Sequence, residues 1–252
     1  MIRSLAALLI LLAPVSTRAL ERVVSLNLCT DQMLVLLAPE KVAALSPLAR
    51  DPTLSYVAAA ATSMPAVRAS AEAVLRLHPD LVLAARFGAQ TTLSVLERER
   101  VPVLRVDLPV DFAGIRAQTR QLAGVLGVAQ RGELVVASMD SVLSASSATL
   151  LPRTAIAWEP RGFVAGPDSM MGAVLDAAGL KNIGVGHWMS AEAVLRTQPD
   201  MIVLPEAPGF PSLATDMLRS PALSGLTRRS IPPALTICAG PFTAYAVALL
   251  GS

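Results

Sequence analysis

The side chains that most often perform catalysis or bind metal ions are scarce in this chain. Its 252 residues include two histidines, His78 and His187, which stand in different halves of the sequence. There is no P-loop, no G-x-S-x-G elbow, no H-E-x-x-H and no complete G-x-G-x-x-G. We therefore expect no catalytic constellation, no metal site of the protein's own and no bound cofactor.

The two cysteines, Cys29 and Cys238, leave two interpretations open. In an exported protein they could form a disulfide, although a spacing in sequence cannot establish that two residues are close in space. As a free thiol, Cys29 could instead serve an exported enzyme as a nucleophile, with Asp31 beside it. A thiol nucleophile needs a nearby base, and neither histidine is close to Cys29 in the sequence.

Reversible binding is the chemistry that the arginine and aromatic residues favour. In parallel α/β domains, ligands bind beyond the carboxyl ends of the strands, and several arginines follow predicted strands here. Guanidinium groups suit carboxylates or phosphates. Aromatic residues make up only 4% of the chain, yet most of them fall in or near the same loops, where they would pack on a ligand's apolar face. The predicted ligand-binding residues are Asn27, Cys29, Thr30, Arg50, Arg86, Phe87, Trp158, Arg161, Trp188 and Phe242.

An internal repeat organises the elements that carry these loops. The stretch SAEAVLRLHPDLVLA at 70–84 returns as SAEAVLRTQPDMIVL at 190–204. In each copy a serine begins a short amphipathic helix, and a Pro-Asp pair ends it before an apolar run that is typical of a buried parallel strand. A solenoid would repeat every ~20–50 residues, so this longer spacing predicts two similar lobes with one copy each.

Strands that alternate with helices predict a mostly parallel sheet in each lobe. Outside the repeat, strands are expected at 22–28, 41–45, 102–107, 154–158 and 234–238, and a late helix is expected near 212–219. Residues 130–149 contain no proline and would span about 30 Å as a helix. We therefore expect an N-terminal lobe at 20–128, a connecting helix at 129–150 and a C-terminal lobe at 151–252.

The first 19 residues predict a cleaved signal peptide and therefore export. Arg3 precedes an apolar run at 5–12, which is too short to span a bilayer, and Thr17-Arg18-Ala19 ends the segment. Removing Arg3 and Arg18 lowers the formal charge from +2 to zero. A neutral mature chain is not expected to bind nucleic acid.

With RVVSL at 22–26, the repeated helix–Pro-Asp–strand phrase and the long connecting helix, the chain resembles the cobalamin and ferric-siderophore type of periplasmic binding protein, which serves ABC importers. The resemblance covers about residues 22–250. It implies two Rossmann-like α/β lobes joined by a single long α-helix, a ligand cleft between the lobes, and a monomer without enzymatic activity. It also implies one acidic residue on each lobe that docks onto arginines of the membrane permease. By motif position these are Glu72 and Glu192.

The function that this resemblance predicts is capture of an iron–siderophore, another metal chelate or a corrinoid in the periplasm, and its delivery to the permease. Any iron or cobalt would then belong to the cargo. The first lobe lacks a cluster of Trp and Tyr, which weakens a cobalamin-specific interpretation, and the chain lacks the histidine ligands of the related zinc and manganese binders. A cobalamin-specific protein, an exported enzyme that uses Cys29 or Asp31, and a sensor or scaffold module are the alternatives.

Overall fold

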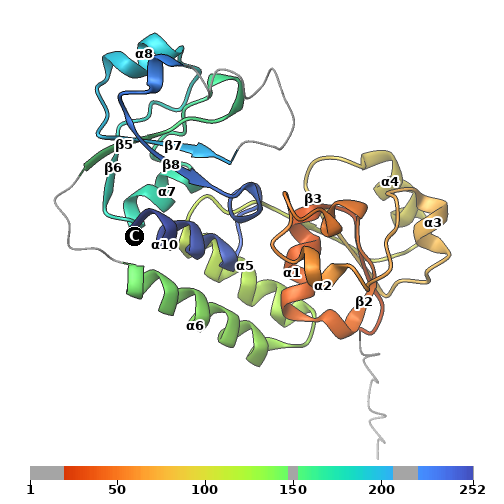
Figure 1. Ribbon diagram of the computed structural model, residues 1–252. Coiled ribbons are helices and arrows are strands. Elements are labelled where there is room, and N and C mark those ends of the chain that lie inside the picture. The colour runs from red at the N-terminus through yellow and green to blue at the C-terminus, as the bar shows by residue number, and fades with distance from the viewer. Residues whose placement is uncertain (1–19, 147–152, 207–220, 252) are drawn as a thin grey trace, which may run out of the picture.

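The computed structural model describes residues 20–146, 153–206 and 221–251, which form two α/β lobes joined by a single long helix (Figure 1). Each lobe contains a parallel sheet of four strands, in the order β2-β1-β3-β4 in the first lobe and β6-β5-β7-β8 in the second. The predicted fold class is confirmed. The expected signal peptide at 1–19 and the helix expected near 212–219 lie outside the described residues. Within the described ranges, every helix is too short or too polar to cross a bilayer.

The first lobe is a sheet with both faces covered. Its strands are β1 (Val23–Ser25), β2 (Val42–Ala44), β3 (Leu81–Ala85) and β4 (Val103–Val106), and its helices are α1 (Leu28–Leu37), α2 (Ala58–Ala61), α3 (Ala71–Leu75) and α4 (Gln90–Arg98). Because successive strand residues point to opposite faces, Val23 and Leu83 pack in one apolar cluster while Val24 and Val82 pack in another. Both faces are buried, so β1 and β3 are almost wholly apolar.

The second lobe repeats this plan. Its strands are β5 (Arg153–Ala157), β6 (Leu180–Asn182), β7 (Met201–Pro205) and β8 (Thr227–Ile231), and its helices include α7 (Met170–Ala177), α8 (Ala191–Arg196) and the C-terminal α10 (Ala244–Gly251). The strand predicted at 234–238 is wrong, because β8 ends at Ile231 and two prolines follow it. A proline has no N–H to donate to a neighbouring strand, and η6 (Pro233–Leu235) is a 3-10 turn instead.

The repeated stretch makes equivalent hydrogen bonds in both lobes. The hydroxyls of Ser70 and Ser190 cap α3 and α8 by accepting the backbone N–H three residues later, both at 3.3 Å. The aspartate of each Pro-Asp pair then anchors the start of the strand beside it. Asp80 accepts the backbone N–H of Arg22 at 3.0 Å, and Asp200 accepts that of Thr154 at 2.7 Å. The repeat therefore fixes both helix starts and both strand starts.

Two long helices, α5 (Phe112–Val125) and α6 (Ala129–Ser146), lie in sequence between the two sheets. Figure 1 shows α6 running beside α5 and α10, along one side of the molecule. Gly132 lets α6 approach α5 closely, since a Cβ at this position would lie 2.4 Å from the Cβ of Ala123. The described part of α6 ends at Ser146, and residues 147–150 of the predicted connector lie outside the description.

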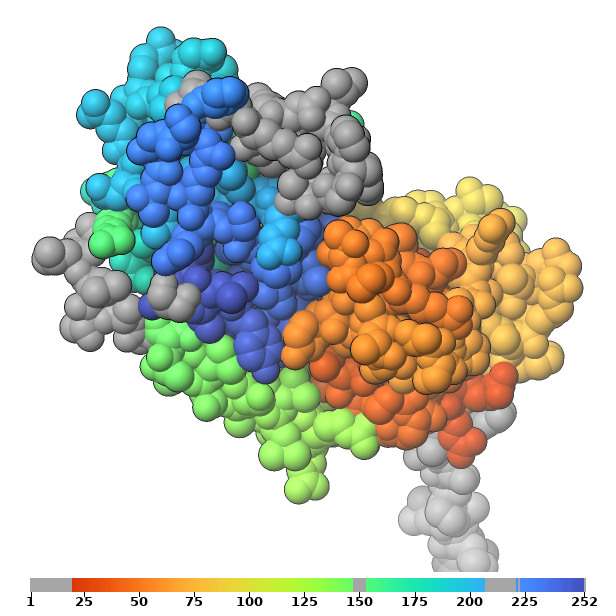
Figure 2. Space-filling view, in the orientation of Figure 1, coloured from red at the N-terminus to blue at the C-terminus, as the bar shows by residue number. Residues whose placement is uncertain are grey.

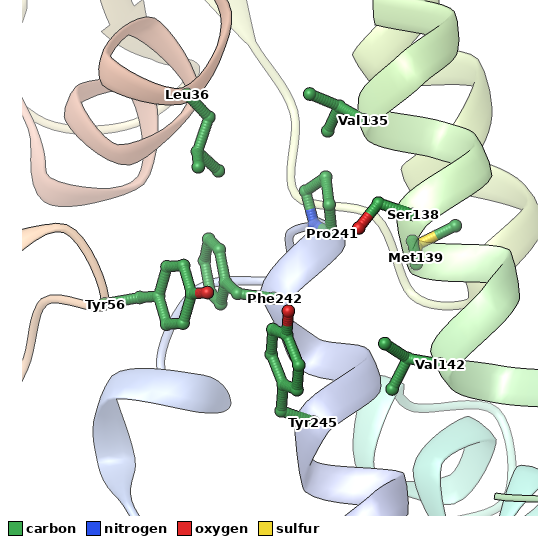
Figure 3. A pocket seen from close by; sticks show the side chains of 9 residues that line it. All are labelled: Leu36, Tyr56, Val135, Ser138, Met139, Val142, Pro241, Phe242 and Tyr245. Carbon is green, nitrogen blue, oxygen red and sulfur yellow. The ribbon is translucent and has the colours of Figure 1, made fainter. Parts of the chain in front are cut away.

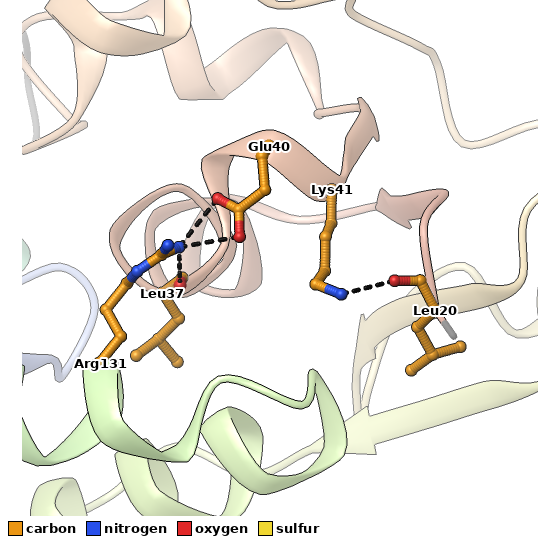
Figure 4. A network of polar contacts seen from close by, with 5 residues as sticks. All are labelled: Leu20, Leu37, Glu40, Lys41 and Arg131. Atoms are coloured by element: carbon orange, nitrogen blue, oxygen red, sulfur yellow. Dashed lines mark hydrogen bonds and ion pairs between the residues drawn. The ribbon is translucent and has the colours of Figure 1, made fainter. Parts of the chain in front are cut away.

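Polar contacts tie α6 to the first lobe at its other end (Figure 4). The Arg131 guanidinium donates to the Glu40 carboxylate at 2.8 Å and to the backbone carbonyl of Leu37 at 2.6 Å. The Leu37 carbonyl belongs to the last turn of α1, so Arg131 also satisfies a helix end. The connecting helix is thus attached to the first lobe by more than the chain itself.

Candidate ligand-binding site

A cavity of about 390 Å³ lies between the lobes, beyond the carboxyl ends of three strands of the second sheet. Its lining residues are Thr53, Leu54, Glu159, Pro160, Pro205, Glu206, Pro233, Thr236 and Ile237. The first two come from the first lobe, Pro205 ends β7, and the others follow β5, β7 and β8. This is the position where the strand-end rule places ligands in α/β folds. The volume lies within the range of about 300–1,000 Å³ that is usual for small-molecule sites.

The contribution of the first lobe comes from a turn that one aspartate holds. The Asp51 carboxylate accepts the backbone N–H of Thr53 at 2.8 Å, and the Asp51 carbonyl accepts that of Leu54 at 3.2 Å. Immediately after the turn, the Tyr56 N–H donates to the buried side-chain oxygen of Gln32 in α1 at 2.7 Å. Thr53 and Leu54 are therefore presented by a turn whose backbone is tied to α1.

Glu159 is the half-buried carboxylate of the cavity. It follows β5 and begins a tight turn in which its backbone N–H donates to the Phe163 carbonyl at 2.7 Å and its carbonyl accepts the Gly162 N–H at 3.1 Å. Burial raises the pKa of Glu159, and its carboxylate makes no hydrogen bond or ion pair with any described residue. Glu206, which follows β7, adds a second and exposed carboxylate.

The rest of the lining is mostly apolar. Three prolines, Leu54 and Ile237 form most of the wall, and Ile237 leaves 49% of its surface exposed. The cavity lining contains no cysteine and no histidine, and no three metal-ligating side chains are grouped anywhere in the described ranges. This arrangement suits reversible binding of a molecule that has an apolar surface and a few polar groups.

The predicted arginines do not line this cavity. Arg86 donates to Asp107 at 2.8 Å across β3 and β4, and this carboxylate raises the pKa of the guanidinium. Arg50 donates to the backbone carbonyl of Met64. Arg161 is exposed and has a positive φ of 64° in the turn after Glu159. None of the three arginines is therefore among the residues that line this cavity.

The predicted aromatic residues fall into two groups. Phe87 and Trp188 are 83% and 69% exposed, and Trp188 lies edge-on to Phe163 with 5.4 Å between ring centroids. Trp158 is completely buried in the core of the second lobe, where its indole N–H donates to the Met189 carbonyl at 3.3 Å. Its ring supports the fold and does not reach the cavity.

Asn27 and Thr30 likewise serve the fold locally. Asn27 caps α1 by accepting the backbone N–H of Cys29 at 3.0 Å and of Thr30 at 3.2 Å. The buried Thr30 hydroxyl lies 2.7 Å from that of Ser25 and accepts from the Asn27 amide at 2.8 Å. Their polar groups are used within the first lobe and are not among those that line the cavity.

The two cysteines form a disulfide between the lobes. Cys29 is in the first turn of α1, and Cys238 follows η6 in the second lobe. Both contact one apolar cluster that includes Leu28 of the first lobe and Phe242 of the second. In Figure 2 the orange segments of the first lobe lie directly against the blue C-terminal segments. The alternative of a free Cys29 nucleophile is wrong, because its sulfur is bonded to Cys238.

An aromatic stack lies at this same boundary (Figure 3). Tyr56 of the first lobe stacks on Phe242 and Tyr245 of the second, with ring centroids 5.1 and 5.8 Å apart. With Leu36 of α1 and residues of α6, the rings enclose a second pocket of about 110 Å³. Phe242, predicted to contact ligand, is 2% exposed, and its ring is used in this contact between lobes.

The cavity residues were missed for identifiable reasons. Glu159 directly follows Trp158, and Glu206 follows the strand of the second repeat, so both stand at strand ends, where α/β folds place ligands. Arginine and aromatic side chains in the loops predicted ligand contacts, whereas glutamate and proline there carried no comparable signal. Thr236 and Ile237 were assigned to a strand that does not exist.

Glu72 and Glu192 are exposed on α3 and α8, which Figure 1 places at the outer ends of the two lobes. Glu72 pairs with Arg76 at 3.2 Å. A hydrogen bond from the Ser190 hydroxyl holds the pKa of Glu192 below its usual value. Both carboxylates face solvent, each with a partner on its own helix or helix cap.

Comparison with known proteins places this arrangement in context. A family model described as "Periplasmic binding protein" matches residues 23–227. A cobalamin-binding protein of Halobacterium salinarum is 29% identical over 146 residues, a match that covers 52% of this chain and only 39% of that protein.

Solved structures share the fold over nearly the whole chain. The periplasmic heme-binding protein RhuT from Roseiflexus sp. RS-1, in its apo form, matches with a TM-score of 0.72 and 24% identity, covering 92% of this chain and 97% of that one. An ABC-type Fe3+-hydroxamate transport protein from Saccharomonospora viridis matches with a TM-score of 0.68 and 20% identity, covering 92% of each chain. At these identities the likeness concerns the fold.

Proposed function

The chain belongs to the periplasmic binding protein family, a family of binding proteins of ABC importers and not of enzymes, and on this premise we propose that it captures a metal chelate or corrinoid and delivers it to a membrane permease. The observation that carries the proposal is the cavity between the lobes. There, Thr53 and Leu54 of one lobe face residues that follow β5, β7 and β8 of the other. A ligand in this cavity would contact both lobes at once.

The chemistry of the lining supports a cargo of this class. Chelates and corrinoids present large apolar surfaces together with a few amide, hydroxyl or charged groups. The cavity offers five apolar residues with Thr53, Thr236 and two carboxylates. The proteins with similar folds include one named for heme and one named for Fe3+-hydroxamate, and the Halobacterium relative is named for cobalamin.

Export is part of the proposal. The segment 1–19 is proposed to be removed as a signal peptide, which leaves the lobes at 20–128 and 151–252 with the connector at 129–150. The disulfide supports an oxidising compartment, since such bonds are rare in reducing cytosol.

Docking on the permease is assigned to Glu72 and Glu192. They occupy equivalent positions of the repeat, one on each lobe, so a permease with two similar subunits would meet one glutamate on each. An isolated surface ion pair contributes only ~0–1 kcal/mol, and a broader interface must surround these contacts.

The two residues proposed for an exported enzyme, Cys29 and Asp31, are both engaged in contacts within the protein. Cys29 has no thiolate while it is bonded to Cys238, and the Asp31 carboxylate is buried and accepts the Ser46 hydroxyl at 2.5 Å. A sensor or scaffold module that binds the same cargo would differ in having no permease partner.

A thermal-shift screen of the mature protein tests the proposal. Cyanocobalamin, hemin and several ferric siderophores would each be added in excess. A ligand at about 100 times its Kd adds about 2.7 kcal/mol to the free energy of unfolding, which gives a clear rise in Tm. Absence of a shift with every chelate and corrinoid would count against this cargo class.

A further inference from the structure

We infer that Glu159 is a specificity-determining residue, which selects cargo that presents a cationic or N–H-donating group to the cavity and discriminates against cargo that presents a carboxylate. The inference rests on the proposed function, because it concerns which chelate or corrinoid the cavity accepts. It reverses the expectation that arginines would bind acidic groups of the ligand.

The charged side chains that line the cavity disfavour an acidic ligand. Its two charged lining residues, Glu159 and Glu206, are both acidic, and no lysine or arginine lines it within the described residues. Arg86, which was predicted to bind ligand, does not line the cavity and is paired with Asp107 on the first lobe. A ligand carboxylate placed in this cavity would meet two like charges, and such juxtaposition disfavours binding.

The half-buried Glu159 carboxylate has no partner of its own among the described residues. An ionised carboxylate that leaves water needs a partner to offset its desolvation, and Glu159 has none among the described residues. An ammonium or amide N–H of the cargo would supply that partner. Exposed Glu206 keeps its water and gains less from the same contact.

Hydrogen bonds also fix the main chain at Glu159. The turn hydrogen bonds at Phe163 and Gly162 fix the main chain on which Glu159 stands, and the preceding Trp158 is locked in the core. The Glu159 side chain therefore extends from a main chain that is fixed on both sides, as a selective contact requires.

The test is a set of binding titrations on the mature protein with four probes. Ferrioxamine B carries a pendant ammonium, its N-acetyl derivative is neutral, cyanocobalamin carries amides, and hemin carries two carboxylates. The variant is Glu159→Gln, and the matched control is Glu99→Gln, an exposed glutamate at the end of α4. Tm values without ligand confirm folding, and we expect Glu159→Gln to be at least as stable as the wild type because it removes an unpaired charge.

We expect hemin to bind most weakly and ferrioxamine B or cyanocobalamin most tightly. Loss of a charged hydrogen-bond partner should weaken the tightest probe about tenfold in Glu159→Gln, with no change in the control. Hemin as the tightest probe, or unchanged affinities in Glu159→Gln, would overturn the assignment of Glu159 and leave the proposed function standing. If none of the four probes binds, the proposed function fails instead.

Discussion

Cys29 and Cys238 are 209 residues apart in the sequence, and their sulfurs are bonded across the boundary between the two lobes. The bond lies beside an apolar cluster that both lobes share and near the stack of Tyr56 on Phe242. Covalent, apolar and aromatic contacts therefore coincide at one place, and the lobes are joined there as well as through α6.

The first prediction concerns the stability that this bond provides. A cross-link over so long a loop restricts the unfolded chain, and loss of a disulfide typically lowers the free energy of unfolding by about 2–4 kcal/mol. We expect the double variant Cys29→Ala/Cys238→Ala to show that decrease in urea denaturation. The wild type in excess dithiothreitol is the control and should unfold at a similarly reduced urea concentration. A variant as stable as the oxidised wild type would contradict the prediction.

The second prediction is that the lobes close little when ligand binds. Three kinds of contact oppose a hinge motion at the lobe boundary, and α6 is tied to α1 through Arg131. Solution X-ray scattering with and without ligand should give nearly equal radii of gyration. Removal of the disulfide should enlarge the difference. A large compaction in the oxidised wild type would show that the boundary does not act as a restraint.

The third prediction separates transport from binding. Reversal of both docking charges, Glu72→Lys with Glu192→Lys, should abolish ligand uptake by cells and leave the Kd of the purified protein unchanged, since neither residue lines the cavity. A matched double variant, Glu99→Lys with Asp168→Lys, reverses two other exposed charges and should transport normally. Normal uptake in the Glu72/Glu192 variant would remove the docking assignment.

The fourth prediction is a pH dependence of stability caused by Asp31. Burial raises the pKa of this carboxyl to about 6, against the opposing effect of hydrogen bonds from Ser25 and Ser46. The folded state thus holds the proton more tightly than the unfolded state, whose pKa is about 4. The contribution of Asp31 is therefore complete below about pH 4 and is lost as the pH rises through 6, a decrease of up to about 3 kcal/mol.

Asp31→Asn should remove this slope, because the amide oxygen still accepts the Ser46 N–H but does not titrate. Urea denaturation of both proteins between about pH 4 and 7 measures the difference. Parallel curves for the two proteins would show that Asp31 does not titrate in this range.

The repeat shows what could be predicted from the sequence. Ser70 caps a helix within its own stretch, Pro79 ends that helix, and Asp80 binds the backbone where the neighbouring strand begins. Because each residue type has a recognisable role at its position, their repetition predicted both lobes. The last strand of the second lobe was predicted in the wrong place, because the true strand is polar and the apolar stretch after it is not a strand. β8 contains Arg228 and Arg229 and is largely exposed, whereas the more apolar 234–238 follows two prolines and is not a strand.

Local sequence patterns could not predict the candidate site, because its lining residues come from separate stretches of both lobes. Thr53 and Leu54 reach the cavity only when α6, the disulfide and the aromatic stack have set the two lobes against each other. Strand ends indicated several loops correctly. Which of their side chains face the same space depends on the contact between the lobes, and the sequence does not display that contact.

The last prediction tests the cavity itself. Ile237 belongs to the apolar wall, and half of its surface is exposed, so Ile237→Arg can place its charge in the cavity without disturbing a core. We expect ligand affinity to fall at least about tenfold, because the bulky side chain fills the space and requires desolvation when ligand enters. Leu134→Arg is the matched control, since Leu134 on α6 is 66% exposed and does not line this cavity. Both variants should melt like the wild type without ligand. If isothermal titration gives Ile237→Arg the wild-type Kd, the ligand binds elsewhere on the protein.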